Sequence, residues 1–274
     1  MTVPGLLSDP GISALYLLYR FAEFLSLLTL TRSGYESNDH IYQESGIYDI
    51  LCLSKNEDPW RRKRMNHIAR RDKELAYISD ASVFEEQKAC RKILQKLNFM
   101  DRSDFEGISE VVKELLGESD GAFINPPFYC DYGTHIKVGK NFFANYNCTI
   151  IDVATVTIGD YCQMAPNVAI YTAGHPVYPT VRNSAYEYGK AITIGDNVWI
   201  GGNTVICPGV HIGDNVVIGA GSVVTRDIPD WCIAVGNPCK VLRKITENDK
   251  RKLFKDEEID DEAWQDIVSR GFAD

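Results

Sequence analysis

A six-residue repeat in the second half of the chain is the feature that most restricts its fold. Aliphatic residues stand at every sixth position from Ile194 to Val224, and a similar six-residue step runs from Val138 to Ile170 with one two-residue insertion. This period differs from the 3.6 residues of an α-helical turn and from the two-residue alternation of a strand. It is typical of a solenoid, in which short strands alternate with turns.

The repeat predicts a mainly β protein built from triangular coils. Glycine follows the aliphatic residue in several hexads, for example after Ile158 and Ile194, and Asp-Asn often comes next. Glycine, asparagine and aspartate are turn residues. Three hexads would therefore make one coil with its aliphatic side chains on the axis, and successive coils would pair as parallel strands.

The sequence pattern divides the chain into four parts. The repeat spans residues 124–243 and is interrupted by one long insertion at 173–191. Residues 66–117 have the spacing of two amphipathic helices, while residues 1–64 are an extension with no chemical motif and residues 244–274 are a charged tail. Solenoids keep regular coils for packing, so we expect functional residues on the insertion.

Each helix of the segment 66–117 is expected to begin at a capping box. Ser82-x-x-Glu85 opens the first and Ser103-x-x-Glu106 the second, and Gly117 is expected to end the second. Short helices cannot bury their apolar faces alone, so they should pack on each other and on the coil.

Composition excludes some functions. The net charge of −9 leaves no basic excess for a general nucleic-acid binder. Arg20 and Glu23 interrupt the apolar stretch from Ile12 to Leu30, which favours a packed amphipathic helix over a membrane span, with a peripheral anchor as the alternative. The eight cysteines form no C-x-x-C pair, so we expect reduced thiols and a cytoplasmic protein.

One histidine stands apart from the others. The chain contains five: His40, His67, His135, His175 and His211. Only His175 lies on the insertion, where Gly174 and Pro176 restrict its backbone. An imidazole can accept a proton from a hydroxyl, but spacing alone is equally compatible with a solvated loop histidine.

Several motifs occur in an order that resembles a known family. They are Asn141-Phe-Phe-Ala-Asn-Tyr-Asn, Ala173-Gly-His-Pro, Arg182-Asn-Ser, Ile194-Gly-Asp-Asn-Val-Trp-Ile-Gly, Gly219-Ala-Gly-Ser-Val-Val-Thr and Gly236-Asn-Pro. With their matching gaps they resemble the maltose and galactoside O-acetyltransferases over about residues 66–250. The resemblance implies a left-handed parallel β-helix, acetyl-CoA as co-substrate, a sugar acceptor, and a homotrimer with active sites between adjacent subunits.

The same resemblance assigns roles to individual residues. It makes His175 the general base that activates a sugar hydroxyl, and Asn145 a residue that contacts the acceptor and stabilises the transition state. Asp80 and Asp131 match acceptor-contacting positions. Asn145 could instead belong to an asparagine ladder, and each aspartate could be a cap or turn residue.

For coenzyme A the resemblance implies a groove along the coil. Its predicted residues are Trp199, Gly202, Ala220, Thr225, Arg226, Lys240 and Arg243. Small residues would let the cofactor approach the backbone, a backbone N–H near Gly202 could hold the developing oxyanion, and Trp199 would form a wall. The basic side chains would form a local patch for phosphates, although they could equally be ordinary surface charge.

A metal centre is the main chemical alternative to general-base catalysis by His175. Zinc carbonic anhydrases share a repeat of this shape and use three histidines, two of them close in sequence. No such pair lies near His175, and the cysteines lack ligand spacing, so we predict no metal.

The acceptor is predicted to be of the glucose or maltose type. Asp152-Val153 and the segment from Arg182 to Lys190 look more like the maltose branch, because the galactoside branch has a second aspartate at the place of Val153. Glu187 on the insertion could supply another acceptor contact. Galactosides, or another small alcohol or amine, are the alternatives. A non-catalytic solenoid that binds partners is the remote alternative, which the presence of His175 disfavours.

Overall fold

The computed structural model describes residues 65–255 and 257–272. The features described below lie within the compact unit of residues 64–274. The extension 1–64, with its apolar stretch, lies outside the described residues. Among the residues that are described, no helix is long and apolar enough to cross a membrane.

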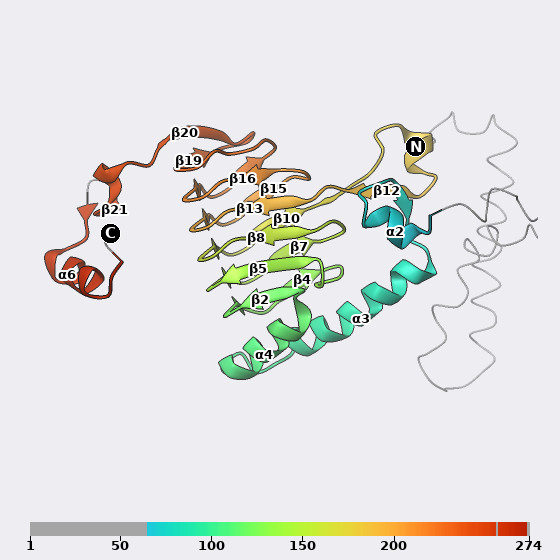
Figure 1. Ribbon diagram of the computed structural model, residues 1–274, viewed down its shortest axis with the longest axis horizontal. Helices are drawn as coiled ribbons and strands as arrows, with labels where there is room; N and C mark the ends of the chain where they lie inside the picture. Colours follow the sequence, from blue (N-terminus) through green and yellow to red (C-terminus); the bar gives the residue numbers. More distant parts are fainter. Residues whose placement is uncertain (1–64, 256, 273–274) are drawn as a thin grey trace, which may run out of the picture. The chain divides into compact units, whose positions relative to one another are not determined.

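The repeat folds into a parallel β-helix with three faces (Figure 1). The β2 face contains β2 (Glu118–Asp120), β5 (Ile136–Lys140), β8 (Val156–Ile158), β13 (Ile192–Ile194) and β16 (His211–Ile212). The β3 face contains β3 (Phe123–Ile124), β6 (Phe143–Ala144), β9 (Gln163–Met164), β14 (Trp199–Ile200), β17 (Val217–Ile218) and β19 (Cys232–Val235), with β20 (Lys240–Lys244) antiparallel at its end. The β4 face contains β4 (Phe128–Cys130), β7 (Cys148–Ile151), β10 (Ala169–Tyr171), β15 (Val205–Ile206) and β18 (Val223–Val224). The predicted fold class is confirmed.

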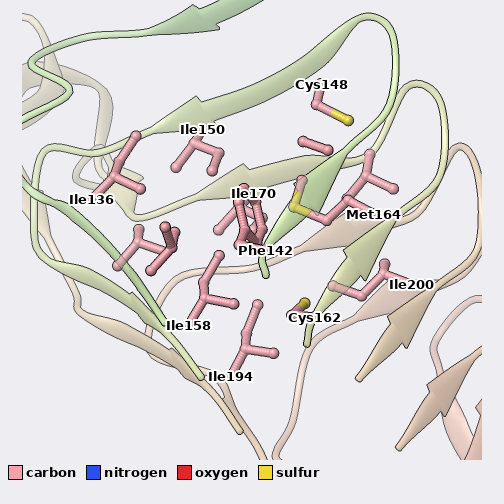
Figure 2. Packing of buried hydrophobic residues seen from close by; sticks show 14 of the residues in the cluster. Ile136, Phe142, Cys148, Ile150, Ile158, Cys162, Met164, Ile170, Ile194 and Ile200 are labelled. Carbon is pink, nitrogen blue, oxygen red and sulfur yellow. The ribbon is translucent and has the colours of Figure 1, made fainter. Parts of the chain in front are cut away.

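The aliphatic repeat residues form the core. Strands pair in register, so that Ile158 lies beside Ile194 and Ile194 beside Ile212. Figure 2 shows Ile158 of the β2 face, Ile200 of the β3 face and Ile170 of the β4 face pointing into the interior. Each of these side chains is buried. The six-residue period therefore places one aliphatic side chain on the axis at every strand, as predicted.

Three corners join the faces, and each has its own chemistry. We call them the first corner (β2 face to β3 face), the second corner (β3 face to β4 face) and the third corner (β4 face to the β2 face of the next coil). At the first corner, the Asp214 carboxylate accepts a hydrogen bond at 2.8 Å from the backbone N–H of Asp196 on the neighbouring coil. A Cβ on Gly195 would overlap that carboxylate oxygen, and Asn215 adopts the left-handed φ of 57° that closes the turn. The repeated Gly-Asp-Asn sequence thus follows from contacts between coils.

The segment before the coil contains α2 (His67–Arg71), β1 (Tyr77–Ile78), α3 (Ala81–Asn98) and α4 (Phe105–Leu115). Leu97 of α3 and Ile108 of α4 are buried in the same cluster as the coil's aliphatic residues. The two helices pack at the end of the coil nearest β3 and β4 (Figure 1). The prediction that they would pack on the larger body is confirmed.

The predicted helix boundaries need correction. Asp80 and Asp104, rather than Ser82 and Ser103, are the N-caps, because each aspartate side chain accepts hydrogen bonds from the first turn of its helix. Gly117 directly follows the C-cap Leu116 of α4, as expected for a helix stop, but it is not among the glycines with a positive φ. A Cβ on Gly117 would overlap the carbonyl oxygen of Thr134, so glycine is needed there for close approach to the coil.

The charged tail has regular structure of its own. It contains η3 (Glu247–Asp249), β21 (Lys252–Phe254), β22 (Glu257–Glu258) and α6 (Asp261–Ser269). The seven cysteines in the described part of the chain are free thiols, and only Cys207 among them is not buried.

We predict that Gly195→Ala destabilises the fold by about 1–3 kcal/mol, because the added methyl group would force Asp214 away from its hydrogen bond. Thr193→Ala is the control, because the Thr193 side chain on the preceding strand is exposed, and it should destabilise the fold less than Gly195→Ala. Urea unfolding of the two variants measures the difference. Equal stability of Gly195→Ala and the parent chain would contradict this account of the corner.

Candidate active site

The insertion is a β-hairpin that leaves the coil at the third corner. Strand β11 (Ala173–Gly174) pairs antiparallel with β12 (Tyr186–Gly189), and the loop between them contains α5 (Pro179–Arg182). The Arg182 guanidinium donates hydrogen bonds to the carbonyl groups of Pro176 and Val177, at 3.2 and 2.9 Å. These bonds fold the loop back on the residues that follow His175.

A strand from the segment before the coil completes this hairpin. β1 pairs antiparallel with β12, so that Tyr77 lies opposite Glu187 and Ile78 opposite Tyr186. The three strands form a small sheet of order β1-β12-β11. The segment that the sequence predicted only as helical therefore also supports the insertion.

His175 follows β11 directly and faces a carboxylate from β12. Its Nε2 lies 4.0 Å from Oε2 of Glu187, and its side chain is 59% exposed whereas that of Glu187 is 18% exposed. The Ser79 hydroxyl, just after β1, donates a hydrogen bond of 2.5 Å to the other Glu187 oxygen, Oε1. The imidazole is thus open to solvent beside a largely buried carboxylate.

Asp131 lies near Glu187 in an acidic environment. The backbone N–H groups of Asp131 and Tyr132 donate to Oδ1 of the buried Asp152, at 2.8 and 3.0 Å. Burial, followed by the negative charges of Asp152 and Glu187, raises the pKa of Asp131 to about 6, against the opposing effect of Arg91. The other oxygen of Asp152 is buried without a hydrogen-bond partner, and burial raises the pKa of this carboxyl too.

Asp80 acts as a helix cap in the structure. Its Oδ1 accepts hydrogen bonds from the N–H groups of Ser82 and Val83 and from the Ser82 hydroxyl. Burial alone would raise the pKa of Asp80, but these hydrogen bonds outweigh burial and lower it. Asp80 directly follows Ser79, whose hydroxyl donates to Glu187, but the Asp80 carboxylate itself is engaged in capping α3.

Asn145 is on a different corner from the insertion. It follows β6 at the second corner, where its side-chain oxygen accepts a hydrogen bond of 2.8 Å from the N–H of Tyr146. The insertion leaves the coil between β10 and β13, at the third corner. A single copy of the chain therefore does not bring the two predicted catalytic residues together. The asparagine ladder occurs at the first corner, where Asn197 donates to Asn215.

The predicted cofactor residues are also divided. Gly202 and Ala220 stack at the second corner, where the N–H of Gly221 donates to the Gly202 carbonyl at 2.8 Å. A Cβ on Gly201 would lie 2.5 Å from the Ala220 nitrogen, so this corner is narrow. The remaining predicted residues lie on the third corner, on the β3 face or on β20: Thr225, Arg226, Trp199, Lys240 and Arg243.

One member of the predicted basic patch is already paired. Arg243 forms two hydrogen bonds of 2.8 Å with the carboxylate of Asp249. The Arg243 side chain and the N–H of Thr246 together lower the pKa of Asp249 to about 2. Arg243 therefore holds the start of the tail, while Arg226 and Lys240 are exposed.

The structure gives Val153 and Ser79 roles that the sequence did not suggest. Val153, on which the acceptor prediction relied, is only 4% exposed and packs with Tyr77, Val83 and Tyr132. It lies inside this small cluster, so an acceptor hydroxyl is not aimed at it. Ser79 was not predicted at all, because its role depends on pairing between β1 and β12, and no periodic signal marks a strand of two residues.

The described residues contain no group of three histidine, cysteine or acidic side chains placed to hold a metal ion.

Comparison with known proteins shows the family to which this chain belongs. The bacterial transferase hexapeptide model, described as six repeats, matches residues 191–226. The chain is 45% identical over 177 residues to the galactoside O-acetyltransferase of Escherichia coli strain K12. This match covers 64% of the present chain and 87% of that protein. The chain belongs to this family of O-acetyltransferases.

Solved structures agree with this assignment. A maltose O-acetyltransferase from Clostridium difficile 630 is 45% identical, with a TM-score of 0.66 over 67% of this chain and 99% of that one. A galactoside acetyltransferase in complex with coenzyme A is 41% identical, with a TM-score of 0.69 over 72% of this chain and 100% of that one. The family uses acetyl-CoA, and the present member is an acetyl-CoA-dependent O-acetyltransferase.

We predict that Asp131→Asn stabilises the chain at about pH 7.5 by on the order of 1–3 kcal/mol and has little effect near pH 4. Because the folded-state pKa of Asp131 is raised, the folded chain binds this proton more tightly than the unfolded chain. Its stabilising effect is present at low pH and is lost as pH rises toward 6. Thermal unfolding at both pH values is the measurement, with Glu110→Gln on the exposed surface of α4 as the control. A gain in stability that is the same at both pH values would contradict a raised pKa for Asp131.

Proposed function

We propose that this chain transfers the acetyl group of acetyl-CoA to a hydroxyl of a glucose- or maltose-type sugar, with His175 as the general base, in a cytoplasmic homotrimer. The observation that carries the proposal is the geometry of His175. It lies on a hairpin braced by a third strand, its imidazole is exposed, and a carboxylate lies on its inner side.

The proposed chemistry needs one proton acceptor. The acceptor hydroxyl attacks the thioester carbonyl carbon while His175 takes its proton, and the carbon–sulfur bond breaks as the tetrahedral state collapses. The imidazolium then returns the proton to the leaving thiolate, so no covalent acyl-enzyme is required. Positioned general bases of this kind typically accelerate a reaction by about 10²–10⁴-fold.

The second corner suits an elongated cofactor. Gly201, Gly202 and Ala220 leave backbone groups close to the surface, and a larger side chain at Gly201 would meet the next coil. Small residues of this kind let a pantetheine arm approach backbone donors, one of which could stabilise the developing oxyanion. The exposed indole of Trp199 on the adjacent β14 is placed to flank it.

A trimer would join the two corners that one copy keeps apart. If copies pack around a threefold axis, the second corner of one subunit, with Asn145, can face the insertion of its neighbour, with His175. Exposed aromatic side chains on and beside the β4 face support this contact: Tyr129, Tyr146 and Tyr171 are 50%, 45% and 38% exposed. The free thiols of the described cysteines are consistent with a reducing cytoplasm.

We predict that His175→Ala and Asn145→Ala each lower kcat by at least about 10²-fold, while the KM for acetyl-CoA changes little with His175→Ala. Trimers assembled from a mixture of the two variants should regain activity. Random mixing leaves about a quarter of the interfaces with both residues intact, if each site takes one residue from each subunit. Thiol release after refolding the mixture measures this recovery. No recovery from assembled mixed trimers would contradict sites between subunits, and an active His175→Ala chain would contradict the mechanism.

The acceptor preference rests on what position 153 lacks. Val153 is buried and cannot accept a hydrogen bond from a sugar, whereas the galactoside branch that this chain resembles has an aspartate at this position. A sugar hydroxyl that loses its carboxylate partner costs roughly 1–3 kcal/mol.

We predict that kcat/KM for glucose or maltose exceeds that for a β-galactoside by about 5–150-fold. A thiol-release assay with each sugar at limiting concentration gives the ratio, and acetyl-CoA hydrolysis without acceptor is the blank. Preference for the galactoside would place this chain in the other branch.

A further inference from the structure

We infer that Ser79 and Glu187 are positioning residues that hold and complement the imidazole of His175. In this arrangement the Ser79 hydroxyl orients the Glu187 carboxylate, and Glu187 acts on the acceptor only through His175. The inference rests on the proposed role of His175 and changes the prediction that Glu187 contacts the acceptor.

Both oxygens of the Glu187 carboxylate point to protein groups. Oε1 receives the Ser79 hydroxyl at 2.5 Å, and Oε2 lies 4.0 Å from Nε2 of His175. The Glu187 side chain is 18% exposed, while His175 is 59% exposed. The geometry therefore places the imidazole between solvent and the carboxylate, so that an acceptor arriving from solvent meets His175 first.

Backbone pairing fixes this arrangement from two sides. β12 carries Glu187 and lies between β11, which ends just before His175, and β1, which ends just before Ser79. Ile78 is held in turn, because its N–H donates to Nδ1 of His67 at 2.9 Å. Strand pairing gives the three side chains less freedom than a flexible loop would.

The charges around Glu187 favour a cation at the position of His175. Tyr77 from β1 faces Glu187 with a buried hydroxyl, and Asp131 from the turn after β4 carries a further carboxyl. The described groups that interact with Glu187 from these elements are thus neutral or acidic, apart from His175. A proton moving onto the imidazole creates a positive charge beside this carboxylate.

A distance of 4.0 Å is too long for a strong hydrogen bond to a neutral imidazole. Once the imidazole is protonated, the same pair is an ion pair in a partly buried setting, where the attraction is stronger than in water. The interaction is therefore made mainly in the transition state. Interactions of that kind raise kcat and leave substrate KM almost unchanged.

The test compares Glu187→Gln, Ser79→Ala, Ser79→Thr and the double variant Ser79→Ala/Glu187→Gln in the full-length chain, using glucose or maltose as acceptor. We expect Glu187→Gln to lower kcat by about 10–100-fold, with KM for both substrates within about twofold of the parent. Ser79→Ala should lower kcat by about 3–10-fold, and Ser79→Thr should restore it. The double variant should match Glu187→Gln alone, because Ser79 acts through Glu187.

Glu74→Gln is the matched control. Glu74 also holds the insertion, since its Oε1 accepts a hydrogen bond of 3.1 Å from the N–H of Ala191, but this contact lies at the far end of β12 from His175. Glu74→Gln should therefore leave kcat unchanged. Thermal unfolding of every variant separates loss of fold from loss of positioning, and Glu187→Asp, which keeps the charge on a shorter side chain, replaces Glu187→Gln if that chain does not fold.

Four results would overturn the inference. A rise in acceptor KM with unchanged kcat in Glu187→Gln would make Glu187 an acceptor contact, and parent-like kinetics would give it no role. Additive losses in the double variant, or failure of Ser79→Thr to restore activity, would separate Ser79 from Glu187. His175→Ala in the same assay keeps the two proposals distinct, because an active His175→Ala chain contradicts the proposed function itself.

Discussion

Contact between successive coils at their corners is the constraint on which the rest of the structure depends. At the first corner an aspartate carboxylate of one coil accepts a hydrogen bond from a backbone N–H of the neighbouring coil. A glycine on the neighbouring coil leaves room for this carboxylate, and a residue with a left-handed φ closes the turn. These three requirements keep the coils in register, and register keeps the aliphatic side chains stacked on the axis. A long insertion can leave such a coil without breaking the stack only where one strand ends and the next has not begun, and the third corner provides that place.

The site therefore depends on elements that the coil positions but does not contain. The hairpin of β11 and β12 carries His175 away from the corner, and β1 braces it from the segment before the coil. Asn145 and Gly202 remain on the second corner. Activity is thus expected to require both the braced hairpin and the assembly of subunits, although each part folds by its own local rules.

The fold was predictable because its signal is local and repeated. Each hexad contains its own aliphatic residue and its own turn, so errors at one hexad do not affect the next, and the insertion and His175 stand out against the period. The helix caps were placed wrongly because serine and aspartate both cap helices and stand close together at Asp80-x-Ser82. The contact between Ser79 and Glu187 could not be predicted, since it joins residues 108 positions apart through a strand of two residues.

The exposures of His175 and Glu187 also explain why an acidic site can serve a neutral sugar. Burial, followed by the negative charges of Asp152 and Glu187, raises the pKa of Asp131 to about 6. Above that pH the Asp131 carboxyl is ionised, and the exposed imidazole of His175 lies beside Glu187. A sugar hydroxyl brings no charge of its own, so the field has little effect on its binding. In the proposed mechanism the imidazole would take the hydroxyl proton and gain a positive charge, and the neighbouring negative charge would then stabilise it. The Asp131 carboxylate, which destabilises the folded chain at neutral pH, would thus join Glu187 in stabilising the proposed transition state.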